Sequence, residues 1–393
     1  MNLFVLTSDR LFASYMKICF VSNFMNHHQQ PVADELYRLL GEDFLWVATT
    51  PADPERIKLG YDDLNNKFPY ILRTYIKEEY EKAYNRCITC DCLIVAYEFG
   101  DIIKRRMELN LLTFICTERI CKKSILQMLS PYNYMSTLIH FTRFRKKPLY
   151  LLSIGEYAAK DFDLSFSFPN KKYRWGYFTD VPQLSNDVHS KWNNEKPLVF
   201  WASRFIDWKH PEYIVFAAEQ LKEEGILCQF EMAGCGDMFN DIEQMIKKKN
   251  LSDYIKLLGP QNHKTIRQKM LASNIFCLTS NRQEGWGAVV GEALASDCIV
   301  ISSKKTGASS SLIIDGKSGI LFKDNCYKDF YLKLREEIIN FKKHHHIAIE
   351  AYNTMFECWN PETAAERLIL LIECLLNNMK SPFTLGPCSK IKK

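Results

Sequence analysis

The stretch that decides the fold is IFCLTSNRQEGWGAVVGEALASDCIVISS, residues 275–303. An apolar strand leads into a polar loop, then into the turn Glu284-Gly285-Trp286-Gly287, and a helix-period segment follows before a second apolar strand. Strand, helix and strand in this order are typical of a parallel βαβ unit. A helix that begins after glycines presents unpaired backbone N–H groups, which attract an anion. The stretch therefore predicts an α/β domain with an anion site at the turn.

The same alternation of apolar strands and amphipathic helices extends over the whole chain in two halves. The expected strands of the first half are 17–22, 44–49, 92–97, 112–117 and 150–154. The expected strands of the second half are 197–202, 228–234, 255–259, 275–280, 298–303 and 319–322. A chain of 393 residues is long for a single core, so we expect two domains. The polar stretch 185–196 separates them, a strong helix follows Pro361, and residues after Ser381 are expected to form an extended end without a folded element.

Composition excludes several classes of protein. The net charge of +5 is mild, whereas nucleic-acid-binding domains carry a stronger, clustered basic footprint. It suits anionic substrates or an anionic membrane surface better. No apolar run reaches the roughly 18 to 20 residues that span a bilayer, and Asp9 and Arg10 interrupt the first apolar stretch. We therefore expect a cytoplasmic protein, and we interpret residues 1–15 as a flexible tail or a translation artefact preceding Met16.

The fourteen cysteines are scattered through expected strands and helices, which indicates reduced, buried thiols. Cys87, Cys90 and Cys92 are clustered enough to offer three ligands to a metal ion. Structural thiols are the favoured interpretation of this cluster, because Cys92 opens an apolar strand.

Further polar residues follow neighbouring strands of the second half. Arg204 and Lys209 follow the strand 197–202, and the turn Gly234-Cys235-Gly236-Asp237 follows the next strand. Because parallel strands end at one edge of a sheet, these loops converge with the turn at Glu284. An arginine and a lysine together suit a pyrophosphate.

Glu284 in the loop and Glu292 on the following helix offer carboxylates at two distances from that phosphate site. One suits a sugar and the other a ribose, and hydrogen bonds of hydroxyls to charged acceptors contribute roughly 1.5 to 3 kcal/mol each. The alternative is a plain loop residue and a solvated helix residue. Taken alone, that alternative would be preferred; convergence with the basic residues favours a binding site.

The spacing E-x7-E from Glu284 to Glu292 resembles the donor-site signature of retaining GT-B glycosyltransferases of the group 1, or family four, type. The resemblance spans residues 197–376, with the motifs in order. It implies an α/β GT-B fold of two Rossmann-like domains that face each other across a cleft. Its parts would be an acceptor-side domain (1–190), a donor-binding domain (191–360) and a helix (361–380) that packs back on the first domain.

The resemblance also implies roles. Arg204 and Lys209 would hold the donor phosphates, and Glu292 the ribose. The donor sugar and diphosphate would contact Glu284, the amides of Gly285, Trp286, Gly287 and Ala288, and the turn with Gly234 and Gly236. The catalytic residues that the resemblance implies are Glu284, Arg204, Lys209 and His27. A general base is not assigned.

The first half resembles the family more loosely. FVSNFMNHHQQPVADEL, residues 20–36, is similar to the first strand, loop and helix of polysaccharide-assembly members, which would place Asn26, His27 and His28 at the cleft. The usual Gly-Gly pair of that loop is missing. A buried or merely exposed histidine is the alternative for one of the two histidines.

Two further acceptor-side candidates follow strands of the first half: Glu118 with Arg119, and WGYF at 175–178. A helix-cap ion pair is the alternative interpretation of Glu118 and Arg119. Asp297 departs from the family, where a small residue is usual.

The activity implied is retaining transfer from a nucleotide-sugar, with a UDP-sugar favoured, to a saccharide or lipid-linked saccharide in bacterial surface polysaccharide (capsule) synthesis. No cofactor or metal is expected, since no Asp-x-Asp motif lies in a suitable loop. A nucleotide-sugar epimerase and a non-catalytic scaffold of the same fold remain alternatives. A dinucleotide oxidoreductase is disfavoured, because no G-x-G-x-x-G follows the first strand.

Two surface segments complete the expectations. Residues 122–147 contain SILQMLS and end in RFRKK, which predicts either a solvated helix with a basic loop or a peripheral contact with an anionic membrane. His344, His345 and His346 are expected to be a solvated stretch between helices.

Overall fold

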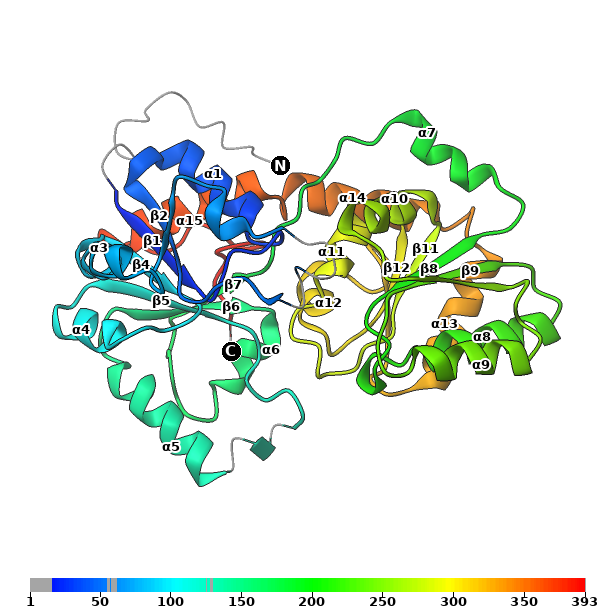
Figure 1. Cartoon of the computed structure of the whole chain (residues 1–393), viewed down its shortest axis with the longest axis horizontal. Coiled ribbons are helices and arrows are strands. Elements are labelled where there is room, and N and C mark those ends of the chain that lie inside the picture. Colours follow the sequence, from blue (N-terminus) through cyan, green and yellow to red (C-terminus); the bar gives the residue numbers. More distant parts are fainter. Residues whose placement is uncertain (1–15, 55–56, 58–61, 125, 128–129, 393) are drawn as a thin grey trace.

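The computed structural model describes residues 16–54, 57, 62–124, 126–127 and 130–392, which form two α/β domains side by side (Figure 1). Residues 1–15, and with them the expectation about their origin, lie outside the described residues. The predicted fold class, α/β with two Rossmann-like domains, is confirmed.

The first domain is built on a parallel sheet of seven strands in the order β3-β2-β1-β4-β5-β6-β7. The strands are β1 (Ile18–Ser22), β2 (Phe44–Ala48), β3 (Ile71–Arg73), β4 (Cys92–Val95), β5 (Leu112–Thr117), β6 (Leu149–Ile154) and β7 (Lys172–Trp175). Its helices are α1 (Gln30–Leu40), α3 (Lys77–Thr89), α4 (Ile102–Glu108), α5 (Pro131–His140) and α6 (Glu156–Asp161).

The second domain repeats this order with six parallel strands, β10-β9-β8-β11-β12-β13. The strands are β8 (Leu198–Ala202), β9 (Gln229–Ala233), β10 (Ile255–Gly259), β11 (Ile275–Leu278), β12 (Ile299–Ser303) and β13 (Ile320–Phe322). Its helices are α8 (Glu212–Glu223), α9 (Phe239–Lys248), α10 (His263–Ala272), α11 (Ala288–Leu294), α12 (Gly307–Leu312), α13 (Tyr327–Ile339) and α14 (His345–Glu357). The linker carries α7 (Asn186–His189) and a 3-10 turn, Ser190–Asn193.

The central strands are buried and mainly apolar because helices cover both faces of each sheet. Every residue of β1, β11 and β12 is buried. The strands β3 and β7 were not predicted. The former has only three residues, and the latter contains Lys172 and Arg174, so neither shows a buried apolar run.

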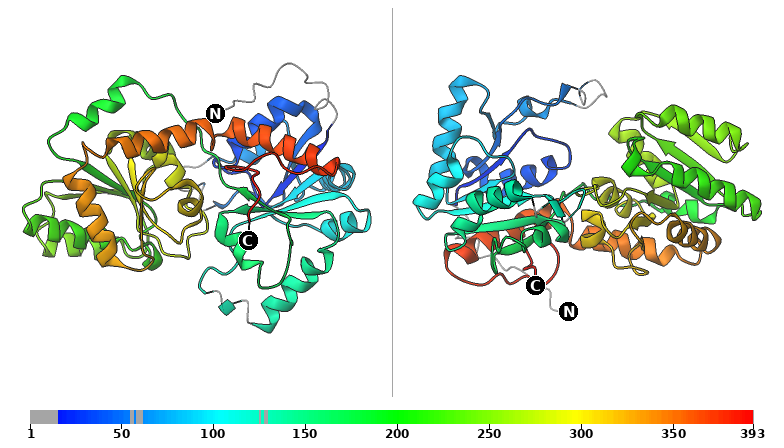
Figure 2. Two further views of the ribbon diagram at one scale, coloured as in Figure 1. Left: turned by 180° about the vertical axis from the view of Figure 1, so that it is seen from behind. Right: turned by 90° about the horizontal axis from the view of Figure 1, so that it is seen from below.

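The last two helices join the domains. Helix α14 packs against α11 and β12 of the second domain, and α15 (Pro361–Leu376) then lies along α1 of the first (Figure 2). The Asn360 side chain caps α15 by accepting a hydrogen bond from the Thr363 amide at 2.7 Å, and Pro361 occupies the first turn, where its missing N–H costs nothing.

The end of the chain is folded, so the expectation of an unstructured extension after Ser381 is wrong. Residues 388–391 pair antiparallel with the free edge of β7, through a hydrogen bond from the Arg174 amide to the Ser389 carbonyl at 2.9 Å. Cys388 and Ser389 are fully buried. An edge strand offers unpaired backbone groups, and the tail satisfies those of β7.

Cys87, Cys90 and Cys92 are buried in the first domain. The Arg106 guanidinium donates to the carbonyls of Cys87 and Cys90 at 2.8 and 3.0 Å, and burial raises the pKa of the Cys90 and Cys92 thiols. A protonated, inert thiol fits the structural interpretation of this cluster.

Among the described residues, no helix combines the length and apolarity needed to cross a bilayer.

The packing of α15 on the first domain generates a stability prediction. Leu368→Ala should lower the free energy of unfolding by about 2 to 5 kcal/mol, because Leu368 is fully buried. The matched control is Leu376→Ala on the same helix, where the side chain is 46% exposed and the change should stay within about 0.5 kcal/mol. Urea unfolding followed by tryptophan fluorescence measures both, and equal losses would contradict the packing of α15.

Candidate functional site

The glycine turn enters α11 as the spacing predicted. Gly287 precedes the helix with φ of +85°, a left-handed conformation that favours glycine. The amides of Gly285, Trp286 and Gly287 donate to no other group of the described chain. Since α11 has only seven residues, these backbone donors, more than a helix dipole, make the turn receptive to an anion.

Close backbone contacts with the start of α12 hold the glycine turn in place. The Gly307 and Ala308 amides donate to the carbonyls of Gly285 and Trp286 at 3.1 and 2.9 Å. A Cβ at Gly307 would lie 2.2 Å from the Gly285 carbonyl oxygen. Only glycine therefore permits this approach, which fixes the direction of the amides.

The Trp286 side chain does not enter the cleft. It is buried in the junction between the domains, where a Cβ at Gly176 would lie 2.5 Å from the indole ring. Tyr177 meets the ring edge-on, with ring centroids 6.2 Å apart, and Trp359 lies at 6.3 Å. The indole is therefore unavailable to a ligand, and only the backbone amide of Trp286 could contact a bound nucleotide-sugar.

Lys209 and Glu284 form an ion pair between side chains that are 10% and 13% exposed. Lys209 ends a 3-10 turn, Asp207–Lys209, that follows β8. Both cations approach the Trp208 ring, with the Lys209 ammonium 4.4 Å and the Arg204 guanidinium 5.9 Å from its centre. Arg204 and Lys209 therefore lie near one aromatic ring at the carboxyl edge of the sheet, and Arg204 is exposed.

The turn after β9 packs directly on the loop after β8. A Cβ at Gly234 would lie 1.9 Å from the Ser203 carbonyl oxygen, and one at Gly236 would lie 2.5 Å from the Phe205 carbonyl oxygen. Both glycines have positive φ, +135° and +149°. Gly234 lines the cavity described next, whereas Gly236 only allows the two loops to pack.

A cavity of about 240 Å³ lies between the domains at this edge. Side chains from both domains line it: His27, His28, Ala202, Ser203, Arg204, Ala233, Cys235, Pro260, Gln261, His263, Ile266, Val289 and Glu292, with Gly234. Lys209, Glu284 and the residues 285–288 are not among the lining residues. The site thus has two parts, the cavity around Glu292 and Arg204, and the neighbouring turn with its ion pair.

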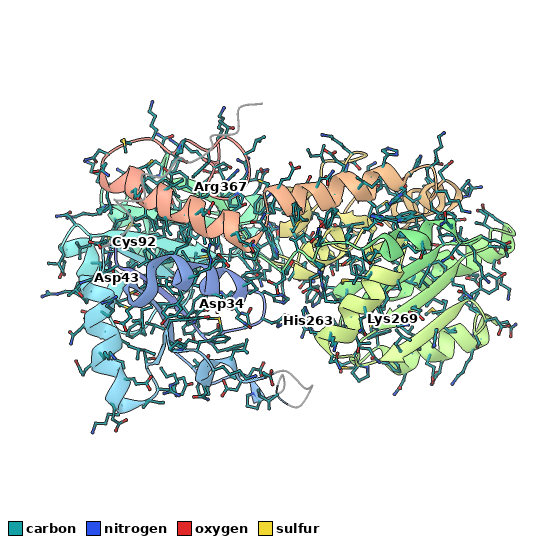
Figure 3. All side chains as sticks on the ribbon, turned by 90° about the horizontal axis from the view of Figure 1, so that it is seen from above. Asp34, Asp43, Cys92, His263, Lys269 and Arg367 are labelled. Carbon is teal, nitrogen blue, oxygen red and sulfur yellow. The ribbon has the colours of Figure 1, made fainter. Side chains whose placement is uncertain are left out.

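Glu292 is buried at the end of the cavity and held by imidazoles. His263 Nε2 lies 3.2 Å and His28 Nδ1 lies 3.5 Å from Glu292 Oε1, and Figure 3 shows His263 on the side of the second domain that faces the first. Burial by itself raises the pKa of Glu292, but the His263 hydrogen bond and the charges of His28, His263 and Arg267 outweigh it and lower the pKa to about 2. Glu292 is therefore a carboxylate throughout the physiological range.

The first domain contributes His27 and His28 to the same cavity. Their ring centroids lie 3.7 Å apart, and His27 lies 4.7 Å from His263. Asn26 has a different role, because its Oδ1 accepts from the His28 amide at 3.0 Å and its carbonyl accepts from two following amides. Asn26 shapes the loop that presents the histidines.

Glu118 reaches across the cleft to the glycine turn. A Cβ at Gly285 would lie 1.7 Å from Glu118 Oε2, so the carboxylate rests against the turn. Tyr177 Oη donates to Glu118 Oε1 at 3.1 Å, and Lys122 pairs with Oε2 at 3.1 Å.

Arg119 turns the other way, into its own domain. It is 5% exposed, its Nη2 lies 3.6 Å from Asp161 Oδ1, and its guanidinium lies 5.1 Å from the Tyr157 ring centre. Burial lowers its pKa. The expected pairing of Glu118 with Arg119 as a cap does not occur, and Arg119 does not line the cavity.

Within the WGYF segment, Trp175 and Phe178 are buried, so Tyr177 alone reaches the cleft.

The sequence interpretation missed His263 and Arg267. Arg267 donates to the Glu292 carbonyl at 2.6 Å and bridges to the Asp180 carbonyl at 3.3 Å. Their place in the chain could have identified them, because the loop after β10 lies at the same sheet edge as the loops already recognised.

His27, His28 and Glu292 also place three ligand atoms within 4.8 Å of one another, close enough to share a metal ion.

Comparison with known proteins places this geometry in a family context. Residues 184–354 match the family model described as Glycosyl transferases group 1. The match covers the linker, the second domain and most of α14, and it ends before α15. It supports a group 1 glycosyltransferase.

Curated relatives match over shorter segments. The alpha-D-kanosaminyltransferase of Streptomyces kanamyceticus is 30% identical over 128 residues, 33% of this chain and 33% of the relative. The poly(ribitol-phosphate) alpha-N-acetylglucosaminyltransferase of Staphylococcus aureus is 24% identical over 169 residues, 43% of this chain and 34% of the relative. The chain thus spans about a third of the length of these relatives.

Solved structures match over nearly the whole chain. Anabaena HepE in complex with UDP superposes with a TM-score of 0.69 at 16% identity, covering 93% of this chain and 100% of that chain. WaaG, a glycosyltransferase involved in lipopolysaccharide biosynthesis, superposes with a TM-score of 0.60 at 13% identity, covering 89% and 98%. At these identities the likeness shows the fold: this chain has the two-domain GT-B architecture.

The lowered pKa of Glu292 predicts a pH dependence of stability. Because the folded pKa lies below the ordinary value of 4.5, the stabilisation is present above pH 4.5 and is lost as the pH falls towards 2. Relative to Glu292→Gln, the wild type should lose about 2 kcal/mol of unfolding free energy between pH 5 and pH 3. Urea unfolding of both proteins at the two pH values checks this, and a difference that does not change with pH would contradict the charge arrangement.

Proposed function

We propose that this chain is a retaining glycosyltransferase that transfers a sugar from a UDP-sugar to a saccharide or lipid-linked saccharide in bacterial surface polysaccharide synthesis, such as that of a capsule. One observation carries the proposal. The carboxyl edge of the second sheet gathers Arg204, Glu292 and the Lys209–Glu284 pair beside backbone amides, opposite two histidines of the first domain.

The donor is proposed to lie along this edge, with its ribose hydroxyls on Glu292 inside the cavity. Charged acceptors bind hydroxyls strongly when shielded from water, and Glu292 is 1% exposed. The diphosphate would lie between Arg204 and the amides of Gly285–Gly287, and the sugar at Glu284. Lys209 then exchanges its carboxylate partner for the diphosphate, which leaves Glu284 to accept from a sugar hydroxyl.

The proposed reaction breaks the bond between the anomeric carbon and the diphosphate oxygen while the acceptor oxygen forms its bond on the same face, so the configuration is retained. The proton of the acceptor hydroxyl passes to the departing diphosphate, and the products are the glycoside and UDP. Negative charge grows on the departing diphosphate. Arg204, Lys209 and the turn amides would stabilise that charge in place, as preorganised donors do in other transfer reactions. The proposed reaction requires no metal ion or other cofactor, because these groups supply the positive charge.

The names of similar proteins support the choice of donor. Anabaena HepE was solved with UDP, with UDP-glucose, and with UDP and glucose. Staphylococcus aureus TarM was solved with UDP and alpha-GlcNAc-glycerol. We therefore favour a UDP-hexose donor, and we assign the acceptor to the first domain, near Glu118, Tyr177 and His27.

The donor assignment predicts the effect of two substitutions. A panel of UDP-sugars is first screened for protection against thermal unfolding, and the best donor is used to measure acceptor-dependent UDP release. Arg204→Ala and Glu284→Ala should each lower kcat/KM by about 10- to 100-fold, the loss expected for one charged hydrogen bond.

The matched controls are Arg335→Ala on α13 and Glu243→Ala on α9, residues of the same types that pair with Glu224 and Lys247 away from the cavity. Turnover that survives both cleft substitutions would rule out the assignment. Interconversion of the donor with no acceptor present would favour an epimerase, and UDP-sugar binding without any turnover a scaffold.

A peripheral membrane contact on the inner face of the cell membrane is part of the proposal. Helix α5 projects from the first domain (Figure 1) and exposes four large apolar side chains: Tyr132, Tyr134, Met135 and Ile139. The basic residues Arg143, Arg145, Lys146 and Lys147 follow it directly. Apolar groups beside a basic cluster suit an anionic leaflet. The expectation for SILQMLS falls partly on residues 125, 128 and 129, which lie outside the described residues.

The membrane contact predicts sedimentation with anionic liposomes that is lost in a charge variant. Replacing the four basic residues 143 and 145–147 by serine should weaken binding at least tenfold, since each contributes about 1 kcal/mol near an anionic surface. The control replaces four exposed lysines of the second domain, Lys247, Lys248, Lys342 and Lys343. Equal sedimentation of the two variants would contradict a contact through α5.

A further inference from the structure

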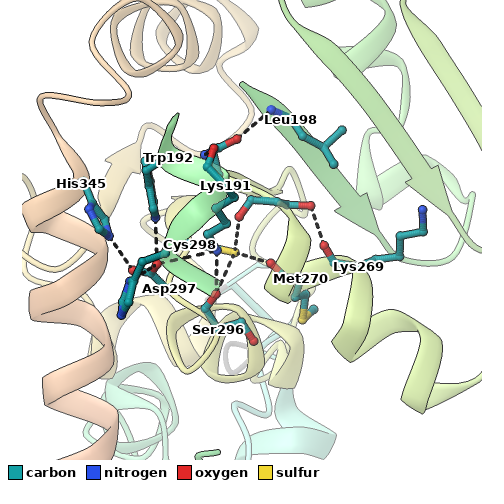
Figure 4. Close-up of polar contacts among 12 residues, drawn as sticks. Lys191, Trp192, Leu198, Lys269, Met270, Ser296, Asp297, Cys298 and His345 are labelled. Atoms are coloured by element: carbon teal, nitrogen blue, oxygen red, sulfur yellow. Dashed lines mark hydrogen bonds and ion pairs between the residues drawn. The ribbon is translucent and has the colours of Figure 1, made fainter. Parts of the chain in front are cut away.

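A second polar cluster lies at the other end of α11, outside the cleft, around Asp297. This carboxylate is fully buried, and its backbone adopts φ of +56°, in the left-handed region. Burying a charge requires compensating partners. The partners come from two separate elements, the linker turn after α7 and the start of α14 (Figure 4).

Two histidines aim ring nitrogens at this carboxylate. His189 Nδ1 lies 3.1 Å from Asp297 Oδ2, and His345 Nε2 lies 3.0 Å from Oδ1. The expectation that residues 344–346 form a solvated stretch is therefore wrong. His345 binds Asp297, His344 Nδ1 lies 2.9 Å from Glu337 Oε2, and only His346 is exposed.

The three groups have the geometry of a metal-ligand set. One atom each of His189, Asp297 and His345 lie within 4.8 Å of one another. A tetrahedral zinc ion with bonds of about 2.0 to 2.1 Å holds its ligand atoms about 3.3 Å apart. The separations of 3.1 Å from His189 Nδ1 to Oδ2 and of 3.0 Å from His345 Nε2 to Oδ1 are close to that value.

Surrounding contacts orient these ligands, as partners of metal-binding side chains usually do. The Trp192 indole nitrogen donates to Asp297 Oδ2 at 2.8 Å, and its ring stacks on His345 with centroids 4.2 Å apart. The Lys191 ammonium lies 4.0 Å from the same oxygen and donates to the Ser296 carbonyl at 3.0 Å. Lys191 is the one cation near the carboxylate in the described chain that would compete with a bound ion.

Access and coordination number also fit. The His189 side chain is 43% exposed and the His345 side chain 22%, so solvent reaches the imidazoles while Asp297 stays buried. Three protein ligands leave one position of a tetrahedral ion for water.

We propose that His189, Asp297 and His345 form a binding site for a divalent transition-metal ion of the zinc type. Two imidazoles with one carboxylate select Zn²⁺ or Co²⁺ over Mg²⁺ and Ca²⁺, which prefer oxygen ligands. The ion would tie the linker and α14 to the end of α11, at a place separate from the donor cavity. The similar group His27, His28 and Glu292 belongs to the donor cavity already described.

The test is Co²⁺ binding to the full chain, followed by its visible d–d absorption, with Zn²⁺ competition. All proteins carry His28→Ala, which leaves the cavity group with two ligands. One Co²⁺ per chain should bind with a tetrahedral spectrum, and Zn²⁺ should displace it. His189→Ala and His345→Ala should each weaken binding by at least about 10- to 100-fold.

His344→Ala and His346→Ala are the matched controls and should keep both the spectrum and the affinity. Circular dichroism checks that each variant is folded; His189→Ala, at a half-exposed position, keeps the test decisive if His345→Ala does not fold. Zn²⁺ should also raise the thermal midpoint of the parent but not of His189→Ala. Absence of Co²⁺ binding, or binding unchanged in His189→Ala, would overturn the proposal and leave the imidazoles as hydrogen-bond partners of Asp297.

Discussion

The position of the site depends on the packing of the Trp286 indole against the backbone of Gly176. Trp286 belongs to the glycine turn, residues 284–287, of the second domain, and Gly176 directly follows the last strand of the first. Any side chain at 176 would overlap the ring. Trp359 and Phe178 extend the same apolar cluster to the point where the chain returns to the first domain. Because packed cores resist continuous deformation, this contact fixes where the turn stands relative to Glu118 and the two cleft histidines.

Charge in the cleft is balanced pair by pair. Glu284 is paired with Lys209, and Glu292 with imidazoles from both domains. A buried carboxylate without such partners would be costly, so these pairs offset the cost of a polar cleft. In the proposed donor complex, a diphosphate would replace Glu284 as the partner of Lys209, and Glu284 would then be able to accept a hydrogen bond from a sugar hydroxyl.

Helix α11 is fixed at both of its ends. The glycine turn anchors its beginning, Glu292 faces the cavity from its second turn, and Asp297 follows its end among His189, Trp192 and His345. The resemblance to group 1 glycosyltransferases predicts a small residue at the position of Asp297. Hydrogen bonds from its polar neighbours stabilise the carboxylate of Asp297, although the residue is buried and its backbone is in the left-handed conformation.

Periodicity and turn chemistry are local properties of the sequence. They were sufficient to predict the two-sheet architecture and all the strands with a buried apolar run. They also predicted the loops that carry Arg204, Lys209 and Glu284. Short or charged edge strands such as β3 and β7 lack that local pattern, and the tail could pair with β7 only once a free sheet edge existed. Which way a side chain turns at the domain junction was likewise decided by the tertiary structure. Arg119 faces inward because Asp161 and Tyr157 lie there. His263 reaches Glu292, and His345 reaches Asp297, because sheet order and helix packing bring together residues 29 and 48 positions apart.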